Sequence, residues 1–194
     1  MDLTQGSHQE KTNRAKKMML WFGMLSMFMT FAGLTSAVIV SKSRPDWINN
    51  FEIPQALFFS TIAIVLSSVV IHFAKKQITA GNASQGLILL IITLFLGLAF
   101  VYFQFSGFNF IRESSGVHFT GPTSNVTTSF MYILMVLHLA HLVSGVIVLL
   151  VVIYNHYKQR YSNGKTLGLE LGVSFWHFLD FLWVYLFLFF YFVR

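Results

Sequence analysis

Near its end the chain reads Phe175-Trp176-His177-Phe178-Leu179-Asp180-Phe181-Leu182-Trp183, inside an apolar segment that opens at Glu170. The ionisable side chains of Glu170, His177 and Asp180 therefore lie in a stretch long enough to cross a bilayer. Such groups are costly in hydrocarbon, so they normally face the interior of a helical bundle or a functional surface rather than lipid. The segment predicts a membrane protein with several helices and a polar interior.

The composition is that of an integral membrane protein. Hydrophobic residues make up 55% of the 194 residues and charged residues only 10%, against about 25% charged residues in soluble domains. The chain has no cysteine, which excludes thiolate metal centres, iron–sulfur clusters and disulfides. The formal charge of +6 could attract nucleic acid, but the basic residues stand in short loops beside apolar runs, where they set membrane topology. We therefore expect no nucleic-acid partner.

Five apolar stretches are long enough to cross a bilayer, which takes about 20 residues in a helix. They cover residues 18–40, 54–74, 87–108, 127–153 and 170–192. The sequence therefore predicts an all-α, polytopic protein in which residues 1–194 form a single membrane domain, a bundle of five transmembrane helices. We expect residues 1–17 to form a polar cytoplasmic leader, because the first apolar run is too long for the core of a signal peptide.

Lysine and arginine residues are unevenly divided between the two sides of this predicted bundle. Nine share the side of the N-terminus: Lys11, Arg14, Lys16, Lys17, Lys75, Lys76, Lys158, Arg160 and Lys165. Four lie on the opposite side: Lys42, Arg44, Arg112 and Arg194. The positive-inside rule then places the N-terminus in the cytoplasm and the C-terminus outside. The expected location is the bacterial inner membrane.

Polar residues recur at helical spacing in the last two predicted helices. His138 and His141 are three residues apart, as are His177 and Asp180, so each pair lies on one helix face. At about 1.5 Å per residue, His141 and Asp180 lie about 18 Å and about 15 Å from the same side of the membrane. The spacing permits a His–Asp hydrogen bond between antiparallel neighbours, and Gly145 would allow these helices to approach closely.

Three interpretations of these side chains stay open at this point. In the first they are structural, because buried histidines and a carboxyl group satisfy one another and fix the helix register. In the second they form a proton or lipid-headgroup site, since such residues recur in proton relays and lipid pockets. In the third, the histidines and Asp180 bind a metal ion, although no second shell is evident. We assign no role to His156, which is expected in a loop.

These motifs, taken in order, resemble subunit III of the haem–copper oxidases. The last helix resembles the family's final helix, a Glu followed by Trp-His-Phe-x-Asp and Trp, through Glu170, Trp176, His177, Phe178, Asp180 and Trp183. The fourth resembles the family's His-x-x-His-x-x-x-Gly helix through His138, His141 and Gly145. The second resembles a Glu-x-Pro opening with later Ser and His, through Glu52, Pro54, Ser68 and His72. Five helices rather than seven is similar to the family's short form.

The resemblance implies an accessory, non-catalytic subunit of a proton-pumping respiratory terminal oxidase, oxidising cytochrome c or quinol. On this hypothesis the chain packs directly against subunit I, stabilises it and holds membrane phospholipid, with subunit II and other subunits in the same complex. Haem and copper are then expected in the partner subunits and no cofactor, metal or catalytic residue in this chain. The implied structural polar cluster consists of His138, His141, Glu170, Trp176, His177 and Asp180.

Departures from the family pattern fall on its lipid and proton residues. Met27 stands where the family has a buried Glu after Ser, and Gly107 stands where a second Glu is expected. Asn155 aligns with a family Arg, so nearby basic residues become the alternative partners of a headgroup. The candidate lipid-headgroup residues are Lys17, His72, Lys158 and Arg160.

Two other functions are compatible with the same residues. One is the accessory subunit of a nitric oxide reductase, which shares the fold and differs in its partner. The other is an independent transporter in which His138, His141, His177 and Asp180 form a proton path. The absence of an inverted repeat from the sequence makes the transporter less attractive.

Overall fold

The computed structural model describes residues 7–44, 47, 54–115, 126–161 and 166–193, which form five helices and no strand. The helices are α1 (His8–Ser41), α2 (Gln55–Thr79), α3 (Ala83–Ser115), α4 (Val126–Tyr157) and α5 (Leu167–Val193). Each is long and apolar enough to cross a membrane. The prediction of an all-α bundle with five transmembrane helices is confirmed. Glu52, Lys165 and Arg194, which the sequence analysis used, lie outside the described residues.

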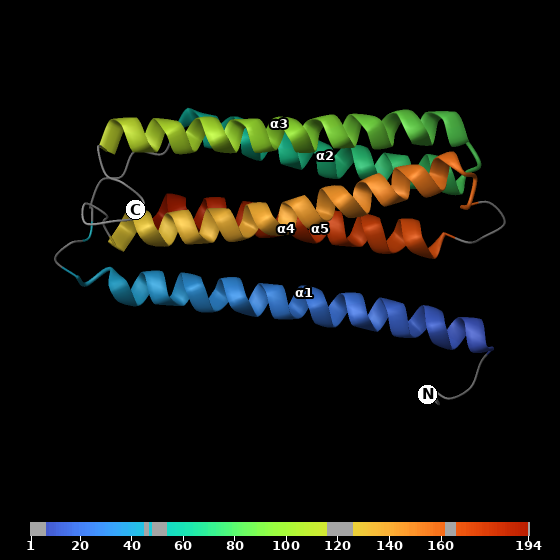
Figure 1. The fold of residues 1–194 in the computed structure, drawn as a ribbon, viewed down its shortest axis with the longest axis horizontal. Coiled ribbons are helices and arrows are strands. Elements are labelled where there is room, and N and C mark those ends of the chain that lie inside the picture. Colours follow the sequence, from blue (N-terminus) through green and yellow to red (C-terminus); the bar gives the residue numbers. More distant parts are fainter. Residues whose placement is uncertain (1–6, 45–46, 48–53, 116–125, 162–165, 194) are drawn as a thin grey trace.

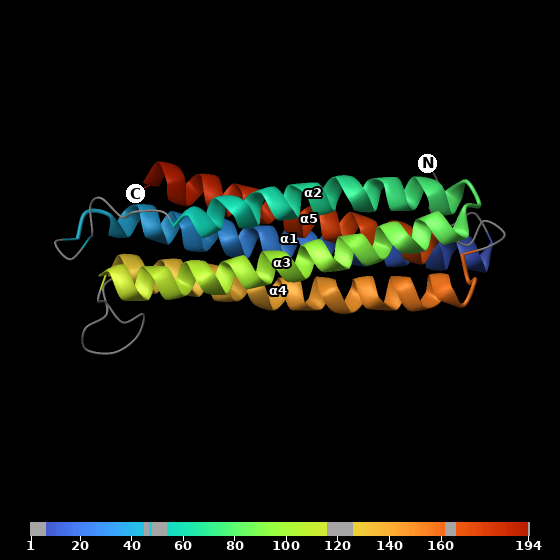
Figure 2. The same cartoon turned by 90° about the horizontal axis from the view of Figure 1, so that it is seen from above.

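Four helices form a square in cross-section and the fifth lies along one side of it. In Figure 1, α2 and α3 form one layer, α4 and α5 the next, and α1 lies beyond the α4–α5 layer. From above, α2 lies beside α5 and α3 beside α4 (Figure 2). Within the described residues α5 contacts α1, α2 and α4, whereas α1 contacts only α4 and α5. Helix α5 is therefore packed on several sides.

The first helix begins at His8, well before the apolar run that starts near Met18. The side chain of Ser7 accepts a hydrogen bond from Glu10 N at 3.3 Å, and Glu10 Oε2 accepts one from Ser7 N at 2.9 Å. This capping box satisfies two backbone donors at the start of the helix. Most of the expected polar leader is therefore helical. Hydropathy indicates which residues lie in the membrane, and a helix can extend beyond those residues.

Glycines bring α4 and α5 close together. A methyl group added at Gly145 would lie 2.5 Å from Leu179 Cδ1, and one added at Gly172 would lie 2.7 Å from Val152 Cγ2. Both distances are too short for real carbon atoms, so only glycine fits these two positions without displacing a buried neighbour. The expectation that Gly145 allows close helix approach is confirmed.

One end of each of the five helices lies at the same end of the bundle. The N-terminal ends of α1, α3 and α5 meet the C-terminal ends of α2 and α4 there (Figure 1). We call this end of the bundle the basic end. Of the nine basic residues that the sequence analysis assigned to one side of the membrane, the eight that the structure describes lie there. They are Lys11, Arg14, Lys16, Lys17, Lys75, Lys76, Lys158 and Arg160.

Replacement of Gly145 by leucine tests the α4–α5 contact. We expect Gly145→Leu to lower the free energy of unfolding by about 1–3 kcal/mol, the usual cost of overpacking a core. Gly33→Leu is the matched control, because nothing lies within 4 Å of a methyl group added at Gly33. The readout is the thermal unfolding midpoint in detergent. Equal midpoints for the two variants would mean that α4 and α5 do not meet at Gly145.

Candidate functional site

Serine and threonine residues of α2 lie on the part of its surface that faces α5 and α3. They occur as two adjacent pairs, Ser60-Thr61 and Ser67-Ser68, seven residues apart. Seven residues are about two helical turns, so the two pairs lie on the same side of the helix. Because α2 and α5 run in opposite directions, the second pair meets the beginning of the α5 motif and Thr61 of the first pair meets its end.

Three hydrogen bonds join the two helices. The indole N–H of Trp176 donates to Ser67 Oγ at 2.9 Å, and that of Trp183 donates to Thr61 Oγ1 at 3.0 Å. His177 Nδ1 lies 2.6 Å from Ser68 Oγ. We call this contact the α2–α5 seam. It consists of Thr61, Ser67, Ser68, Trp176, His177, Asp180 and Trp183.

Trp176 lies where all four helices of the square meet. Its ring contacts α3 at Gly97, where an added methyl group would lie 2.9 Å from Trp176 Cη2. The same ring lies near Gly145 of α4, and its N–H bonds to Ser67 of α2. The side chain is 1% exposed. A large aromatic ring with a polar N–H thus fills a space that the two glycines leave, and Ser67 supplies the acceptor that a buried indole needs.

Asp180 is buried in the seam without a hydrogen bond. It is 4% exposed, and neither carboxyl oxygen has a partner among the described residues. The hydroxyl group of Ser68 on α2 lies 2.6 Å from Nδ1 of His177, one turn before Asp180 on α5. Buried polar groups without a partner are rare in proteins and ask for an explanation.

His138 of α4 is also buried without a hydrogen bond. It is 1% exposed, and both ring nitrogens lack a partner in the described part of the chain. Its ring lies 5.3 Å from that of Trp183, 6.0 Å from that of Phe100 and 6.4 Å from that of Phe31. These neighbours come from α5, α3 and α1, so His138 occupies an aromatic cage between helices.

The predicted His–Asp hydrogen bond between α4 and α5 is wrong. His141 Nδ1 lies 2.7 Å from the carbonyl oxygen of Leu137 in its own helix, and its ring faces Phe31 of α1. Neither carboxyl oxygen of Asp180 has a hydrogen-bond partner among the described residues. The physical reason is rotation, since α5 presents Leu179 to α4 and the next residue points about 100° away around the helix.

The six residues of the implied polar cluster do not form one hydrogen-bonded group, although the ring of His138 lies 5.3 Å from that of Trp183 in the α2–α5 seam. Trp176, His177 and Asp180 lie in the α2–α5 seam, while His138 and His141 lie among aromatic rings. No group of three or more His, Asp or Glu side chains that could hold a metal ion occurs within the described ranges.

Glu170 ties α5 to α1 at the basic end. Its Oε2 lies 3.0 Å from Lys17 Nζ, and its Oε1 accepts a hydrogen bond from Thr166 Oγ1 at 3.2 Å. The Lys17 and Glu170 side chains are 52% and 36% exposed. An exposed pair of this kind contributes about 0–1 kcal/mol. It orients the start of α1 more than it stabilises the bundle.

The other candidate headgroup residues are exposed at the same end. Lys158 Nζ lies 4.7 Å from the centre of the Tyr154 ring, and Arg160 Nη1 donates to Asn155 Oδ1 at 3.2 Å. His72 is exposed on α2, with its ring 6.4 Å from that of His177. The three residues thus do not form one site, because His72 belongs to the α2 side and the other two to the end of α4.

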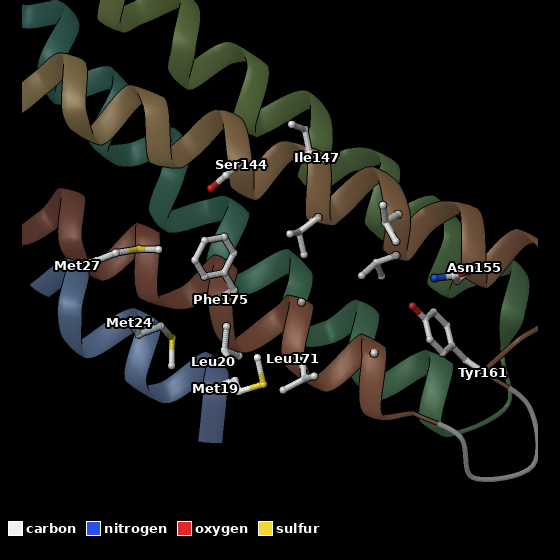
Figure 3. Close-up of a pocket in the computed structure, with 16 residues that line it drawn as sticks. Met19, Leu20, Met24, Met27, Ser144, Ile147, Asn155, Tyr161, Leu171 and Phe175 are labelled. Carbon is white, nitrogen blue, oxygen red and sulfur yellow. The ribbon is translucent and has the colours of Figure 1, made fainter. Parts of the chain in front are cut away.

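An apolar groove of about 520 Å³ runs between α1, α4 and α5. In Figure 3, Met19, Met24 and Met27 of α1 line one wall of the groove. Asn155 and Tyr161 lie at the end of the groove that is farthest from Met27. Met27 therefore presents a thioether to this groove. Burial raises the pKa of the Tyr161 phenol, with an opposing contribution from the Asn155 side chain. The hydroxyl of Tyr161 is therefore protonated at neutral pH.

Two polar contacts escaped the sequence analysis. His156, which was assigned no role, is a buried residue of α4 whose Nε2 lies 2.8 Å from the carbonyl oxygen of Ala83 at the start of α3. Gln104 Nε2 donates to Ser60 Oγ at 3.1 Å inside the α2–α3 contact. The seven-residue spacing of the α2 hydroxyl pairs was the available signal for Ser60, Thr61 and Ser67.

Comparison with known proteins gives a consistent result. The family described as cytochrome c oxidase subunit III matches residues 4–194. Three proteins named "Cytochrome c oxidase subunit 3" illustrate the similarity. That of Prototheca wickerhamii is 31% identical over 72% of this chain and 50% of its own length. That of Rhipicephalus sanguineus is 31% identical over 96% of this chain and 74% of its own length. That of Schizophyllum commune is 26% identical over 88% and 62%. The chain thus spans between half and three quarters of the length of these relatives.

Two buried histidines of α4 should respond differently to replacement by phenylalanine. His156→Phe removes the contact with the Ala83 carbonyl, so we expect a loss of about 1 kcal/mol in the free energy of unfolding. His138→Phe removes no hydrogen bond, keeps the aromatic contacts and relieves two unpaired nitrogens, so we expect unchanged or higher stability. Unfolding midpoints in detergent compare the two variants. A larger loss for His138→Phe would contradict the aromatic-cage description.

Proposed function

The chain belongs to the cytochrome c oxidase subunit III family, and on that premise we propose that it is an accessory, non-redox subunit of a respiratory haem–copper terminal oxidase. The match of the family over residues 4–194 is the observation that carries this proposal. Reduction of oxygen to water would take place on haem and copper in partner subunits. This chain would supply a helical surface that packs against subunit I, within a complex that also contains subunit II.

The distribution of polar groups supports a packing role. The hydroxyl, indole and imidazole groups of the α2–α5 seam face each other inside the bundle. Large apolar side chains such as Trp21, Phe22 and Met29 of α1 point outward, with 66–69% of their surfaces exposed. A bundle that keeps its polar groups in its interior can present an apolar exterior to lipid and to neighbouring subunits. The family match favours this function over the nitric oxide reductase subunit and the transporter.

We propose that the basic end faces the cytoplasm of a bacterium. The eight described basic residues at that end support this orientation through the positive-inside rule. In the same orientation the ion pair between Lys17 and Glu170 lies at the cytoplasmic surface of the membrane.

The groove between α1, α4 and α5 is the proposed lipid site. Its apolar walls suit an acyl chain, and Asn155 and Tyr161 lie at the end nearest the basic residues. Arg160 bonds to Asn155 and so lies close to that end, which makes Arg160 and its neighbour Lys158 the best candidates for a phosphate headgroup. Lys17 is engaged by Glu170, and His72 stands on α2, which does not line the groove.

Affinity purification of the tagged chain tests the oxidase assignment. From membranes in mild detergent, we expect mass spectrometry to identify a large subunit rich in transmembrane helices. A reduced-minus-oxidised optical spectrum of the same sample should show haem absorbance. Recovery of the chain alone and colourless, from membranes that contain active oxidase, would contradict membership of the complex.

Removal of the charge at position 160 tests the lipid site. Arg160→Gln should lower the amount of anionic phospholipid that stays bound after purification, because a headgroup contact of about 1 kcal/mol per basic residue is lost. Native mass spectrometry measures the retained lipid. Lys76→Gln is the matched control, since Lys76 lies at the same end on α2 and does not line the groove. An equal loss in both variants would indicate a nonspecific surface effect.

A further inference from the structure

We propose that the contact between α1 and α5 holds a phospholipid with a primary-amine headgroup, at a site separate from the groove between α1, α4 and α5. The inference goes beyond the lipid site proposed above and does not depend on the identity of the complex. It rests on two cavities that follow one another along the same side of this helix pair. We call the first, at the basic end, the polar cleft, and the other the second groove.

The polar cleft carries charges of both signs. Its volume is about 280 Å³, and its lining includes the cations Arg14 and Lys17 and the carboxylates Glu10 and Glu170. Lys17 and Glu170 are paired with each other at 3.0 Å. The guanidinium group of Arg14 has no hydrogen bond or ion pair within the described ranges. Glu10 uses Oε2 to accept a bond from Ser7 N. A headgroup that carries both a phosphate and an ammonium complements this lining.

The second groove is apolar and has a volume of about 470 Å³. The aromatic rings of Trp21 and Phe28 on α1 and of Phe178 and Phe181 on α5 form much of its lining. Rings and aliphatic chains gain many small dispersion contacts when they pack together. The second groove therefore suits acyl chains, as the polar cleft suits a headgroup.

The cleft and the second groove lie in line because their lining residues recur every three or four positions. Residues at this spacing share one face of a helix. Both helices begin at the basic end (Figure 1), so the two faces run side by side into the membrane. The lining residues that show the spacing are Arg14, Lys17, Trp21, Leu25 and Phe28 on α1 and Glu170, Ser174, His177 and Phe181 on α5.

The groove of about 520 Å³ lies on the other side of the α1–α5 contact. On α5 it is lined by Leu171 and Phe175, whereas Ser174 and Phe178 line the second groove. Neighbouring residues of a helix point about 100° apart, so the two grooves use different faces of α5. Met24 of α1 lines both and separates them. The two grooves are therefore independent sites.

Two polar groups of α5 line the second groove near the polar cleft. Ser174 is exposed, and its hydroxyl has no hydrogen bond in the described part of the chain. His177 has Nδ1 2.6 Å from Ser68 Oγ, which leaves Nε2 for an occupant of the groove. Along the helix axis, Ser174 and His177 lie about 6 Å and about 10 Å from Glu170.

That depth matches the ester groups of a phospholipid. The headgroup region of each leaflet is about 5–8 Å thick, and the ester carbonyls lie at its inner boundary. A hydroxyl or imidazole N–H at this depth needs an acceptor that water does not supply. The carbonyl oxygens of a lipid whose headgroup fills the polar cleft are such acceptors.

The carboxylates of the cleft select the kind of headgroup. A primary ammonium can donate charge-assisted hydrogen bonds to Glu10 and Glu170, while the phosphate accepts from Arg14. The quaternary ammonium of a choline headgroup has no N–H to donate. A glycerol headgroup has no positive charge to place beside the carboxylates. The order of affinity should therefore be ethanolamine before choline and glycerol.

Native mass spectrometry of the full-length chain, in the assembly with which it purifies, tests this order. After bound lipid is removed in detergent, the sample receives phosphatidylethanolamine, phosphatidylcholine or phosphatidylglycerol with identical acyl chains. We expect the ethanolamine lipid to bind about tenfold more tightly, because the other two lack its charge-assisted bonds. Glu10→Gln should remove this preference and keep the helix start, since glutamine also serves in a capping box. Equal affinities for the three lipids in the unmodified protein would overturn the proposal.

Arg14→Gln tests the phosphate contact. The affinity for all three lipids at this site should fall by about tenfold, because each carries a phosphate. Lys16→Gln is the matched control, since Lys16 is an exposed cation of the same helix that does not line the cleft. Arg160→Gln, which tests the other groove, should leave the binding of the ethanolamine lipid unchanged. Equal effects of Arg14→Gln and Lys16→Gln would contradict the site.

Ser174→Ala tests whether the same lipid enters the second groove. The unmodified protein should prefer an ester-linked ethanolamine lipid about fivefold over its ether-linked analogue, which has no carbonyl oxygens. Ser174→Ala should lose this preference, whereas Ser26→Ala, at an exposed serine that lines neither cavity, should keep it. The variant breaks no hydrogen bond of the described chain, so it should fold normally. An unchanged preference in Ser174→Ala would overturn the placement of the lipid in the second groove.

Discussion

The hydrogen bond from Trp176 Nε1 to Ser67 Oγ is the contact on which the arrangement of the four central helices depends. The hydrocarbon core of a membrane contains no water to accept or donate hydrogen bonds, so a polar group there is stabilised by a hydrogen-bond partner within the protein. The indole N–H therefore fixes the side of α5 that faces α2. The ring then extends to α3 and α4, where Gly97 and Gly145 leave room for it. One side chain thus determines both the rotation of α5 and its distance from three neighbours.

Helix α1 is attached to this square more loosely, and the attachment explains the groove. A hydrogen bond of 2.8 Å between Thr35 Oγ1 and the Tyr185 hydroxyl joins α1 to α5. The ion pair of Lys17 and Glu170 joins the same two helices at the basic end. Between these two points the walls facing α4 and α5 are apolar, and a volume of about 520 Å³ stays open. Because α1 is held at two separated points, space remains between it and the α4–α5 layer. The apolar side chains that line this groove suit an acyl chain.

The sequence predicted the number of helices well, because hydropathy over about 20 residues is a direct consequence of bilayer thickness. It also drew attention to Trp176, His177 and Asp180, since polar groups within an apolar segment stand out. The pairing of Asp180 with a histidine was wrong because spacing along one helix does not say which neighbour each face meets. The missed contact of His156 has a related cause. Helix α4 continues past the apolar run, so a residue expected in a loop lies inside the bundle.

A double-mutant cycle on Ser67→Ala and Trp176→Phe tests the central interaction most directly. The free energy of unfolding is measured for the unmodified chain, both single variants and the double variant under identical detergent conditions. If the bond orients α5, the two single losses should overlap by about 1 kcal/mol, so that the double variant is more stable than their sum predicts. Additive losses, with no coupling between the two positions, would contradict the dependence of the bundle on this contact.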